Sequence, residues 1–323
     1  MRYTILGKSG LEVSSVAFGT WQLGGDWGPT DAEEAIAAIQ RAADLGVTFF
    51  DTAQSYGFGA SERLLAEALR GRPRDDLVIA TKGGLRPNGS GGVARDASAA
   101  QILAGVEDSL RALETDHIDL YQVHWPDPAT PFDETASALA KLVADGKVRH
   151  VGVSNFDVAQ IEAFSATLPV ETVQPPYHLF RREIERELLP FTAAHDIGVL
   201  VYGPLAHGLL GGHLQRGTQF AKGDWRSKSA VFQGPDFERN LAVVAELQSF
   251  ALTELHVTLG QLAIAWTLAN PAVDVAIVGT RDPRHVDEAT ASGDIELDAA
   301  AMRRIDEIMQ RATPVAGPSP EMM

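Results

Sequence analysis

The chain has 323 residues, 45% of them hydrophobic, which is enough for a large core, and its formal net charge is −16 at pH 7. A strongly acidic protein repels phosphate backbones and anionic lipid surfaces, so binding to nucleic acid or to a membrane is not expected. The chain contains no cysteine, which excludes disulfides, thiolate nucleophiles and cysteine-ligated metals.

Two segments indicate where the protein resides. The first ten residues, MRYTILGKSG, lack the apolar core of a signal peptide. The most apolar long stretch, 259–278, contains Asn270, Pro271 and Asp274, which is typical of a helix, a turn and a strand rather than a membrane span. We therefore expect a cytoplasmic protein.

Short apolar strands alternate with helical patterns along the chain. Residues 1–13 predict a hairpin that turns at GKSG. The strands predicted after it cover 15–19, 48–53, 77–82, 118–124, 148–154, 171–175, 198–203 and 275–280. The predicted helices cover 30–46, 61–71, 98–113, 131–145, 157–167, 183–196, 258–269 and 283–292. A long glycine-rich loop with an extra helix occupies 205–256, after the seventh strand, and a C-terminal helix occupies 298–312.

This alternation predicts the architecture. Thr30 and Glu33 have capping-box spacing, and Ser61 is expected to cap the second helix. Strands separated by helical crossovers predict a parallel sheet, and continuously apolar strands predict burial on both faces. Eight units without a break favour a single (β/α)8 barrel domain, a TIM barrel, over residues 1–323. A doubly wound open sheet is the alternative, but the first strand ends in AFGTWQLGG, without the G-x-G-x-x-G turn of that fold.

Polar side chains end almost every predicted strand. They are Asp51, Lys82, His124, Ser154, Asn155, Gln174, Tyr202 and Thr280. The carboxyl ends of the strands of a parallel barrel share one rim, and such barrels carry their chemistry there. We therefore expect these side chains to gather at the barrel mouth.

The stretch FFDTAQSYG, residues 49–57, adds a phenol to this rim, because Tyr56 follows Asp51 by five residues. A free phenol has a pKa of about 10, and a nearby ammonium lowers that value. We infer that Asp51 holds Lys82, and that Lys82 prepares Tyr56 to donate a proton near neutral pH, which is general acid catalysis. His124 would hydrogen-bond the substrate oxygen.

Each of these residues also has a purely structural interpretation. An aspartate at a strand end is often a turn former or a helix cap, and Lys82 has the sequence context of an ordinary exposed lysine. A lone histidine such as His124 is more often a satisfied core residue. The functional interpretation depends on all of them sharing one rim. A metal site is not expected, because the chain has neither an H-x-x-x-H pair nor carboxylates with ligand spacing.

Six motifs in order carry a resemblance to a known family. They are FFDTAQSYG, ATKGG, IDLYQVHWPDP, GVSNF, VYGPLAHGLLGG and IVGT. With them the chain resembles the aldo-keto reductase family over essentially its whole length, and most of all its bacterial branch of inositol- and stress-related reductases. The resemblance implies a (β/α)8 barrel that binds NADPH across its mouth and transfers hydride to a carbonyl carbon. It places the family's catalytic residues on Asp51, Tyr56, Lys82 and His124.

The resemblance also implies a set of cofactor contacts. Ser154, Asn155 and Gln174 would hold the nicotinamide amide, Tyr202 would stack on its ring, and Gly19, Thr20 and Trp21 would border it. The segment of Gly203, Pro204, Leu205, Ala206, His207, Gly208 and Leu210 would cover the pyrophosphate with backbone amides. His213 and Arg226 lie near this segment in sequence, and Arg226 is a candidate phosphate contact. Gly279, Thr280 and Arg281 would meet the adenosine 2′-phosphate, with His285 and Glu288 in the adenosine pocket.

The adenosine pocket departs from the family pattern. Many relatives carry a lysine at Gly279, an arginine at His285 and an asparagine at Ala289. Arg281 and Arg284 would compensate, since a guanidinium suits a phosphate. NADP(H) is therefore the expected cofactor, and NAD(H) is the alternative.

The substrate pocket is expected around Tyr56 and His124. Trp21 and Trp125 would flank it and Trp27 would extend the same wall, which favours an aromatic or sugar-like carbonyl as the small-molecule substrate. A plain structural wall is the alternative interpretation of these tryptophans.

The leading function is carbonyl reduction, or oxidation of the corresponding alcohol. A regulatory subunit that binds cofactor with little turnover, like the channel-associated subunits of this superfamily, is the second hypothesis. A Schiff-base lyase that uses Lys82 is the third.

Overall fold

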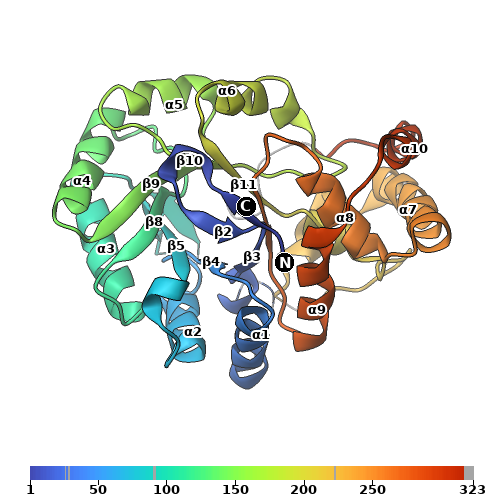
Figure 1. Ribbon diagram of the computed structural model, residues 1–323, viewed down its shortest axis with the longest axis horizontal. Helices are drawn as coiled ribbons and strands as arrows, with labels where there is room; N and C mark the ends of the chain where they lie inside the picture. Colours follow the sequence, from blue (N-terminus) through green and yellow to red (C-terminus); the bar gives the residue numbers. More distant parts are fainter. Residues whose placement is uncertain (26, 28–29, 90–91, 222, 316–323) are drawn as a thin grey trace.

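The computed structural model describes residues 1–25, 27, 30–89, 92–221 and 223–315. In this part of the chain, eight parallel strands close into a barrel surrounded by helices (Figure 1). In ring order they are β3 (Val16–Gly19), β4 (Phe49–Asp51), β5 (Val78–Gly83), β8 (Ile118–Val123), β9 (Val148–Ser154), β10 (Thr172–Gln174), β11 (Gly198–Tyr202) and β12 (Val275–Val278). β12 closes the ring by pairing with β3. The predicted barrel is confirmed, and the open-sheet alternative is wrong.

Helices follow the barrel strands and cover their outer face. They are α1 (Ala32–Asp44), α2 (Ala60–Leu69), α3 (Ala99–Ala112), α4 (Phe132–Ala144), α5 (Val158–Ser165), α6 (Leu188–Ala194), α8 (Leu259–Leu268) and α9 (Pro283–Ala291). Two further helices, α7 (Gly234–Phe250) and α10 (Ala299–Met309), contact each other beside the barrel (Figure 1). These two helices are the predicted extra helix and the predicted C-terminal helix.

The predicted N-terminal hairpin covers the amino ends of the barrel strands. It consists of β1 (Tyr3–Ile5) and β2 (Glu12–Ser14), and its Leu6 and Val13 are fully buried in the inner barrel core. Gly7 has φ +47, and a Cβ there would lie 2.2 Å from the backbone nitrogen of Gly198, so only glycine allows this close approach. A second hairpin, β6 (Leu85–Pro87) with β7 (Val93–Arg95), was not predicted.

Two helices begin differently from the prediction. The N-cap of α1 is Asp31, whose carboxylate accepts hydrogen bonds from two amides of the first turn, so the capping box at Thr30 is wrong. A carboxylate bonds two amides at once and is favoured by the helix dipole. α2 begins after Gly59, which has φ +89, and Ser61 is buried and donates to the carbonyl oxygen of Thr20 instead of capping.

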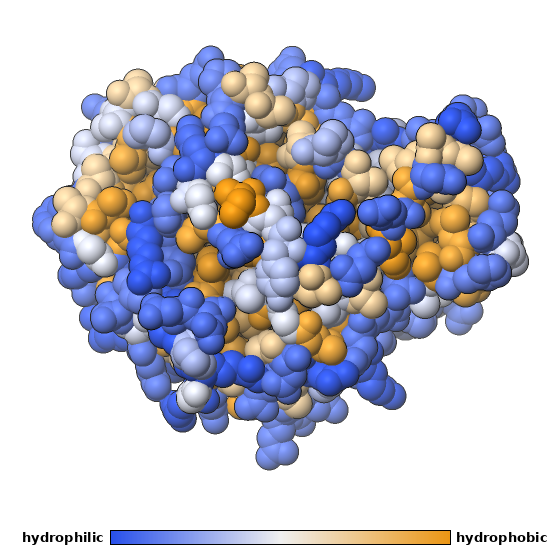
Figure 2. Space-filling view, viewed as in Figure 1, coloured by the Kyte–Doolittle hydropathy of each residue, from blue (hydrophilic) through white to orange (hydrophobic). Residues whose placement is uncertain are grey.

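Hydrophilic residues cover much of the face that carries the N-terminal hairpin, and apolar residues are interspersed among them (Figure 2). This agrees with the large net negative charge of the chain. Among the residues described, none of the helices combines the length and the apolar character that crossing a membrane requires.

A half-buried carboxyl group precedes the last barrel strand. Asp274 Oδ2 accepts a 2.7 Å hydrogen bond from the backbone N–H of Val199. Burial raises the pKa of Asp274 to about 6, and the charge of Asp196 adds to the rise, while the hydrogen bond from Val199 opposes it. Between about pH 4 and pH 6 the folded protein therefore holds a proton that the unfolded chain has lost. This contribution to stability is present at low pH and is lost as the pH rises through 6.

We expect Asp274→Asn to stabilise the protein by about 2 kcal/mol at pH 8, because the amide oxygen still accepts the Val199 N–H and no charge is buried. The gain should shrink toward zero near pH 4. Urea unfolding of the variant and of wild type at both pH values measures it, with Asp75→Asn as the control at an exposed carboxylate. A gain of the same size at both pH values would contradict the ionisation argument.

Candidate active site

The alternation of inward and outward residues places polar side chains inside the barrel mouth. On β4, Phe49 belongs to the inner core and Phe50 to the outer core between strands and helices. Side chains on a strand alternate between its faces, so Asp51 faces inward above Phe49. On β5, Ala80 belongs to the inner core, so Lys82 faces inward as well. The carboxylate at the end of the strand FFD is thereby directed into the barrel.

Lys82 and Asp51 form a buried ion pair at this level. Lys82 Nζ lies 2.6 Å from Asp51 Oδ1, 2.9 Å from the carbonyl oxygen of Thr52 and 3.4 Å from the hydroxyl of Tyr56. The exposed fraction is 1% for Lys82 and 3% for Asp51. An ammonium has three N–H donors, and these three acceptors account for all of them. The lysine is therefore held with one N–H directed at the phenol.

Tyr56 is positioned by close packing of two turns. A Cβ on Gly24 would lie 2.8 Å from the backbone of Tyr56, so the absence of a side chain lets the two segments touch. The His124 ring meets the Tyr56 ring edge-on at 5.7 Å between centroids, and its Nδ1 lies 3.3 Å from the Ser55 hydroxyl. The structure thus brings together the four residues proposed for catalysis, Asp51, Tyr56, Lys82 and His124.

A hydrogen-bonded cluster lies beside this group. Ser154 donates to the carbonyl oxygen of Gln174 at 2.9 Å, and Asn155 Nδ2 lies 3.0 Å from the Ser154 hydroxyl. The Tyr202 hydroxyl donates to Asn155 Oδ1 at 2.8 Å. The side-chain amide of Gln174 donates to Asp51 Oδ2 at 2.9 Å. The four residues predicted around the nicotinamide are therefore connected to one another and to the ion pair.

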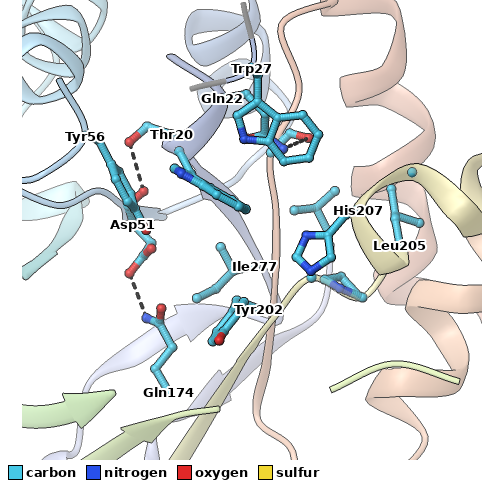
Figure 3. Close-up of a pocket in the computed structure, with 17 residues that line it drawn as sticks. Thr20, Gln22, Trp27, Asp51, Tyr56, Gln174, Tyr202, Leu205, His207 and Ile277 are labelled. Atoms are coloured by element: carbon cyan, nitrogen blue, oxygen red, sulfur yellow. Dashed lines mark hydrogen bonds between the residues drawn. The ribbon is translucent and has the colours of Figure 1, made fainter. Parts of the chain in front are cut away.

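A cavity of about 170 Å³ lies beside these groups. Asp51, Tyr56, Gln174 and Tyr202 line it, whereas Lys82, His124, Ser154 and Asn155 are not among its lining residues. Asp51, Tyr56 and Gln174 lie on one side of it, and His207 and Leu205 lie on the other (Figure 3). Its lining includes these residues predicted for the site: Gly19, Thr20, Trp21, Trp27, Asp51, Tyr56, Gln174, Tyr202, Gly203, Pro204, Leu205, His207, Gly208 and Gly279. Three lining residues were not predicted, namely Gln22, Ile277 and Val278. Their side chains are neutral and belong to no catalytic or binding motif, so nothing in the sequence pointed to them.

The loop after β11 carries unusual backbone conformations. φ is positive at Gly203 and Gly208, and also at two non-glycine residues, Ala206 and His207. A left-handed conformation is unfavourable for a residue with a Cβ and is concentrated at functional sites. Backbone turned in this way forms concave groups of N–H donors that bind anions. The geometry agrees with the role predicted for this loop.

An aromatic cluster is built on Trp21 and Trp27, two residues that line the cavity. Trp225 stacks on Trp21 at 6.1 Å between centroids and meets Trp27 edge-on at 5.7 Å. Arg226 lies over the Trp27 ring at 4.7 Å, bonds Asp224 through several atoms and donates to the carbonyl oxygen of His207 at 3.2 Å. The sequence analysis did not predict Trp225, because within DWR only the arginine carries a charge that suits a phosphate.

Trp125 lies apart from this cavity. Its side chain is 9% exposed and packs under the guanidinium of Arg95, 5.1 Å from the ring centre, and it is absent from the cavity lining among the residues described. Its place in a substrate pocket stays a prediction.

The adenosine side of the predicted site is held by internal contacts. Arg284 is bidentate on Asp282, the N-cap of α9, and this contact holds the pKa of Asp282 well below its usual range. Arg281 donates to the carbonyl oxygen of Trp27 at 3.3 Å. A Cβ on Gly279 would lie 2.1 Å from Gln22 Oε1. Gln22 therefore fills the space that a side chain at position 279 would need.

The remaining predicted adenosine residues lie close to one another. Glu288 accepts a hydrogen bond from Thr258, and the rings of His213 and His285 lie nearly parallel with 6.3 Å between their centroids. Thr280 accepts from the backbone N–H of Asp282 at 3.0 Å. The structure thus gathers these residues around the N-terminal end of α9, where the prediction expected the adenosine.

Comparison with known proteins assigns the class. The model of the family described as "Aldo/keto reductase family" matches residues 15–310. The chain belongs to the aldo/keto reductase family, and the resemblance drawn from the six motifs is confirmed. The chain is 39% identical to the aldo-keto reductase YhdN of Bacillus subtilis, over 96% of this chain and 94% of that one. It is 34% identical to an Arabidopsis thaliana protein named as a probable voltage-gated potassium channel subunit beta, over 96% of this chain and 97% of that one.

Solved structures agree with this assignment. The glycerol dehydrogenase AKR11B4 from Gluconobacter oxydans is 39% identical, with a TM-score of 0.86 over 96% of this chain and 95% of that one. An aldo/keto reductase from Klebsiella pneumoniae in complex with NADP and acetate is 29% identical, with a TM-score of 0.73 over 99% of each chain.

Proposed function

We propose that this protein is an NADP(H)-dependent oxidoreductase that reduces the carbonyl group of small aldehydes or ketones, with Tyr56 as the general acid. One observation carries the proposal. The buried Lys82 has one N–H on Asp51 and another on the Tyr56 hydroxyl, and both Asp51 and Tyr56 line the cavity. A structural ion pair alone does not need a phenol at this place.

Each residue of this group has a defined role in the proposed reaction. The nicotinamide, when bound, supplies the hydride that reaches the carbonyl carbon. Tyr56 donates its proton to the carbonyl oxygen, and Lys82 stabilises the phenolate that remains. Asp51 keeps Lys82 oriented. His124, edge-on to Tyr56, hydrogen-bonds the same oxygen and holds the substrate against the proton donor.

The residues present suit a nicotinamide dinucleotide. The amide and hydroxyl groups of Ser154, Asn155 and Gln174 offer the donors and acceptors that a carboxamide needs, and Tyr202 supplies an aromatic face beside them. Gly203 and Gly208 line the adjoining cavity, so backbone can approach a pyrophosphate closely there. Arg281 supplies positive charge just before α9, which supports NADP(H) over NAD(H).

The first test is an absorbance assay with purified protein, NADPH or NADH, and a reactive aldehyde such as 4-nitrobenzaldehyde. Consumption of NADPH faster than NADH is the expected result. Consumption of NADH alone would keep the chemistry and overturn the assignment of the adenosine pocket. Binding of both cofactors without consumption of either, across a panel of aldehydes and ketones, would count against reduction.

A second function is favoured by the similarity to the probable channel subunit beta of Arabidopsis thaliana. A regulatory protein on the same barrel would bind the cofactor and turn it over very slowly. Rapid turnover with a simple aldehyde argues against this role. Slow cofactor release together with negligible turnover would favour it.

The Schiff-base hypothesis has weaker support. All three N–H groups of Lys82 have acceptors, and its side chain has no exposed surface, so the amine is not presented to a carbonyl carbon. Borohydride trapping of a substrate on Lys82 would support this hypothesis.

A further inference from the structure

Two glutamines lie beside the Asp51–Lys82 pair inside the barrel. Gln122 lies on β8, where Leu120 belongs to the inner core and Tyr121 to the outer core, so alternation directs Gln122 inward. Its exposed fraction is 0%, and that of Gln174 is 2%. The sequence analysis assigned a role to Gln174 and none to Gln122.

Both amides contact one carboxylate oxygen. Gln174 Nε2 lies 2.9 Å from Asp51 Oδ2, and Gln122 Nε2 lies 3.4 Å from the same atom. Gln174 Nε2 also lies 3.2 Å from Gln122 Oε1. The three side chains therefore form a closed triangle on the side of Asp51 that faces away from Lys82.

The carboxylate determines which end of each amide faces it. An ionised carboxylate only accepts hydrogen bonds, so each glutamine presents its NH₂ group to Asp51. The second N–H of Gln174 then donates to Gln122. Both donors of Gln174 are engaged, and its Oε1 is the atom that it offers to a ligand.

Room for this arrangement comes from Gly152 on β9, which pairs with Gln122. A Cβ at position 152 would lie 2.1 Å from Thr172 Oγ1 and 3.2 Å from Gln122 Cγ. Any larger residue at 152 would clash first with Thr172 and would also press against Gln122.

We propose that Gln122 is a positioning residue for the proton donor Tyr56 and acts through Asp51 and Lys82, an inference that rests on the proposed function. A nicotinamide carboxamide that binds Gln174 through its Oε1 pulls this side chain toward the cofactor and weakens its hydrogen bond to Asp51 Oδ2. Gln122 then remains as the donor that holds Oδ2, so Oδ1 stays on Lys82 and the ammonium stays on the Tyr56 hydroxyl. Gln122 thus keeps Lys82 and Tyr56 in place when Gln174 turns from Asp51 to the cofactor.

The titratable groups that face Tyr56 include Lys82 from β5, whose Nζ lies 5.1 Å from the ring centre, Asp51 from β4 behind it, and His124 after β8. Gln122 is bonded to Asp51. The effect of Gln122 on Tyr56 therefore passes through the ion pair.

The test compares Gln122→Met with a matched control, Gln54→Met. Methionine keeps the length of glutamine and removes its hydrogen bonds. Gln54 is also buried, and its Oε1 has no hydrogen-bond partner in the described structure. Ultraviolet absorbance reports tyrosinate formation as the pH rises, and the difference from Tyr56→Phe isolates Tyr56. Titrations are made with and without saturating NADP⁺, and kcat and KM are measured beside them.

With NADP⁺ bound, Tyr56 in Gln122→Met should ionise about one pH unit higher than in wild type, the size expected for losing one hydrogen bond to a charged group. The shift should be smaller without NADP⁺, because Gln174 still holds Asp51. At neutral pH, kcat should fall about 10-fold while KM for the carbonyl substrate stays within about twofold. Gln54→Met should match wild type in all three measurements.

Two results would overturn the inference. One is a Gln122→Met protein that titrates like wild type with NADP⁺ bound, and the other is an equal shift in Gln54→Met. If Gln122→Met does not fold, Gln122→Asn, which withdraws the amide from Asp51, is measured in the same way. The absorbance titration needs no turnover, so an inactive wild type would contradict the proposed function while the titration still decides the role of Gln122.

Discussion

Replacing Tyr56 by phenylalanine is expected to lower kcat for carbonyl reduction by about 10³-fold while NADPH still binds. The phenol is the one proton donor that the described structure places within reach of Lys82, with 3.4 Å between the two polar atoms. Phenylalanine keeps the ring that packs against Trp21 and His124, so the pocket keeps its shape. The measurement is the rate of NADPH consumption with a saturating aldehyde, together with NADPH fluorescence to confirm binding.

The control for this prediction is Tyr121→Phe. Tyr121 is a fully buried tyrosine on β8 whose hydroxyl has no hydrogen-bond partner in the described structure. Burial raises the pKa of Tyr121 above its usual value, and the nearby Glu62 adds to the rise, so this phenol stays protonated. The same atom is removed in both variants, but of the two only Tyr56 lies on the cavity. Full activity in Tyr56→Phe, or an equal loss in Tyr121→Phe, would refute the assignment of the acid.

The second large effect concerns stability. Asp51→Leu should destabilise the protein by about 3–5 kcal/mol, because it leaves the ammonium of Lys82 buried without its counter-ion. Lys82→Met should cost less, because Asp51 keeps the amide donors of Gln174 and Gln122. Urea unfolding followed by circular dichroism measures both single variants against wild type.

The double variant Asp51→Leu with Lys82→Met separates stability from function. It buries no charge, so we expect it to recover most of the stability lost in Asp51→Leu. It should nevertheless reduce carbonyls no faster than Tyr56→Phe, since nothing stabilises the phenolate. A double variant as unstable as Asp51→Leu would show that something other than the isolated charge causes the loss. A double variant with normal turnover would remove the ion pair from the mechanism.

Several features followed from the sequence because they depend on local pattern. Apolar strands separated by helical crossovers close into a barrel, as predicted from their spacing. Residues that end parallel strands share a rim by geometry, so the convergence of Asp51, Lys82 and His124 could be expected from the order of residues alone. The added hairpin and the two extra helices were visible for the same reason, since each has its own turn or periodic pattern.

Other features were set by contacts between distant segments. Gln122 looks like any polar residue within IDLYQVH, and only the register of β8 against β5 and β9 brings it beside Lys82 and within reach of Asp51. Trp225 reaches Trp21 because the long loop after β11 folds back onto the segment that follows β3. Arg284 was expected to bind a phosphate of the cofactor. Its guanidinium is instead bonded to Asp282, two residues away. Side-chain choices of this kind depend on which neighbour is nearest in space.

By itself, the sequence of this protein determined the order of strands and helices, the rim on which the polar residues lie, and the family. The reason is that the spacing of apolar residues and the identity of the polar residues at the strand ends can be read from the chain without knowing its contacts. The tertiary structure decided which donor meets which acceptor. It directed the third N–H of Lys82 to Tyr56, placed two glutamines on one oxygen of Asp51 and stacked Trp225 on Trp21. The physical reason is that hydrogen bonds and ring contacts depend on differences of a few tenths of an ångström, which are set only when the barrel closes and the interior is packed.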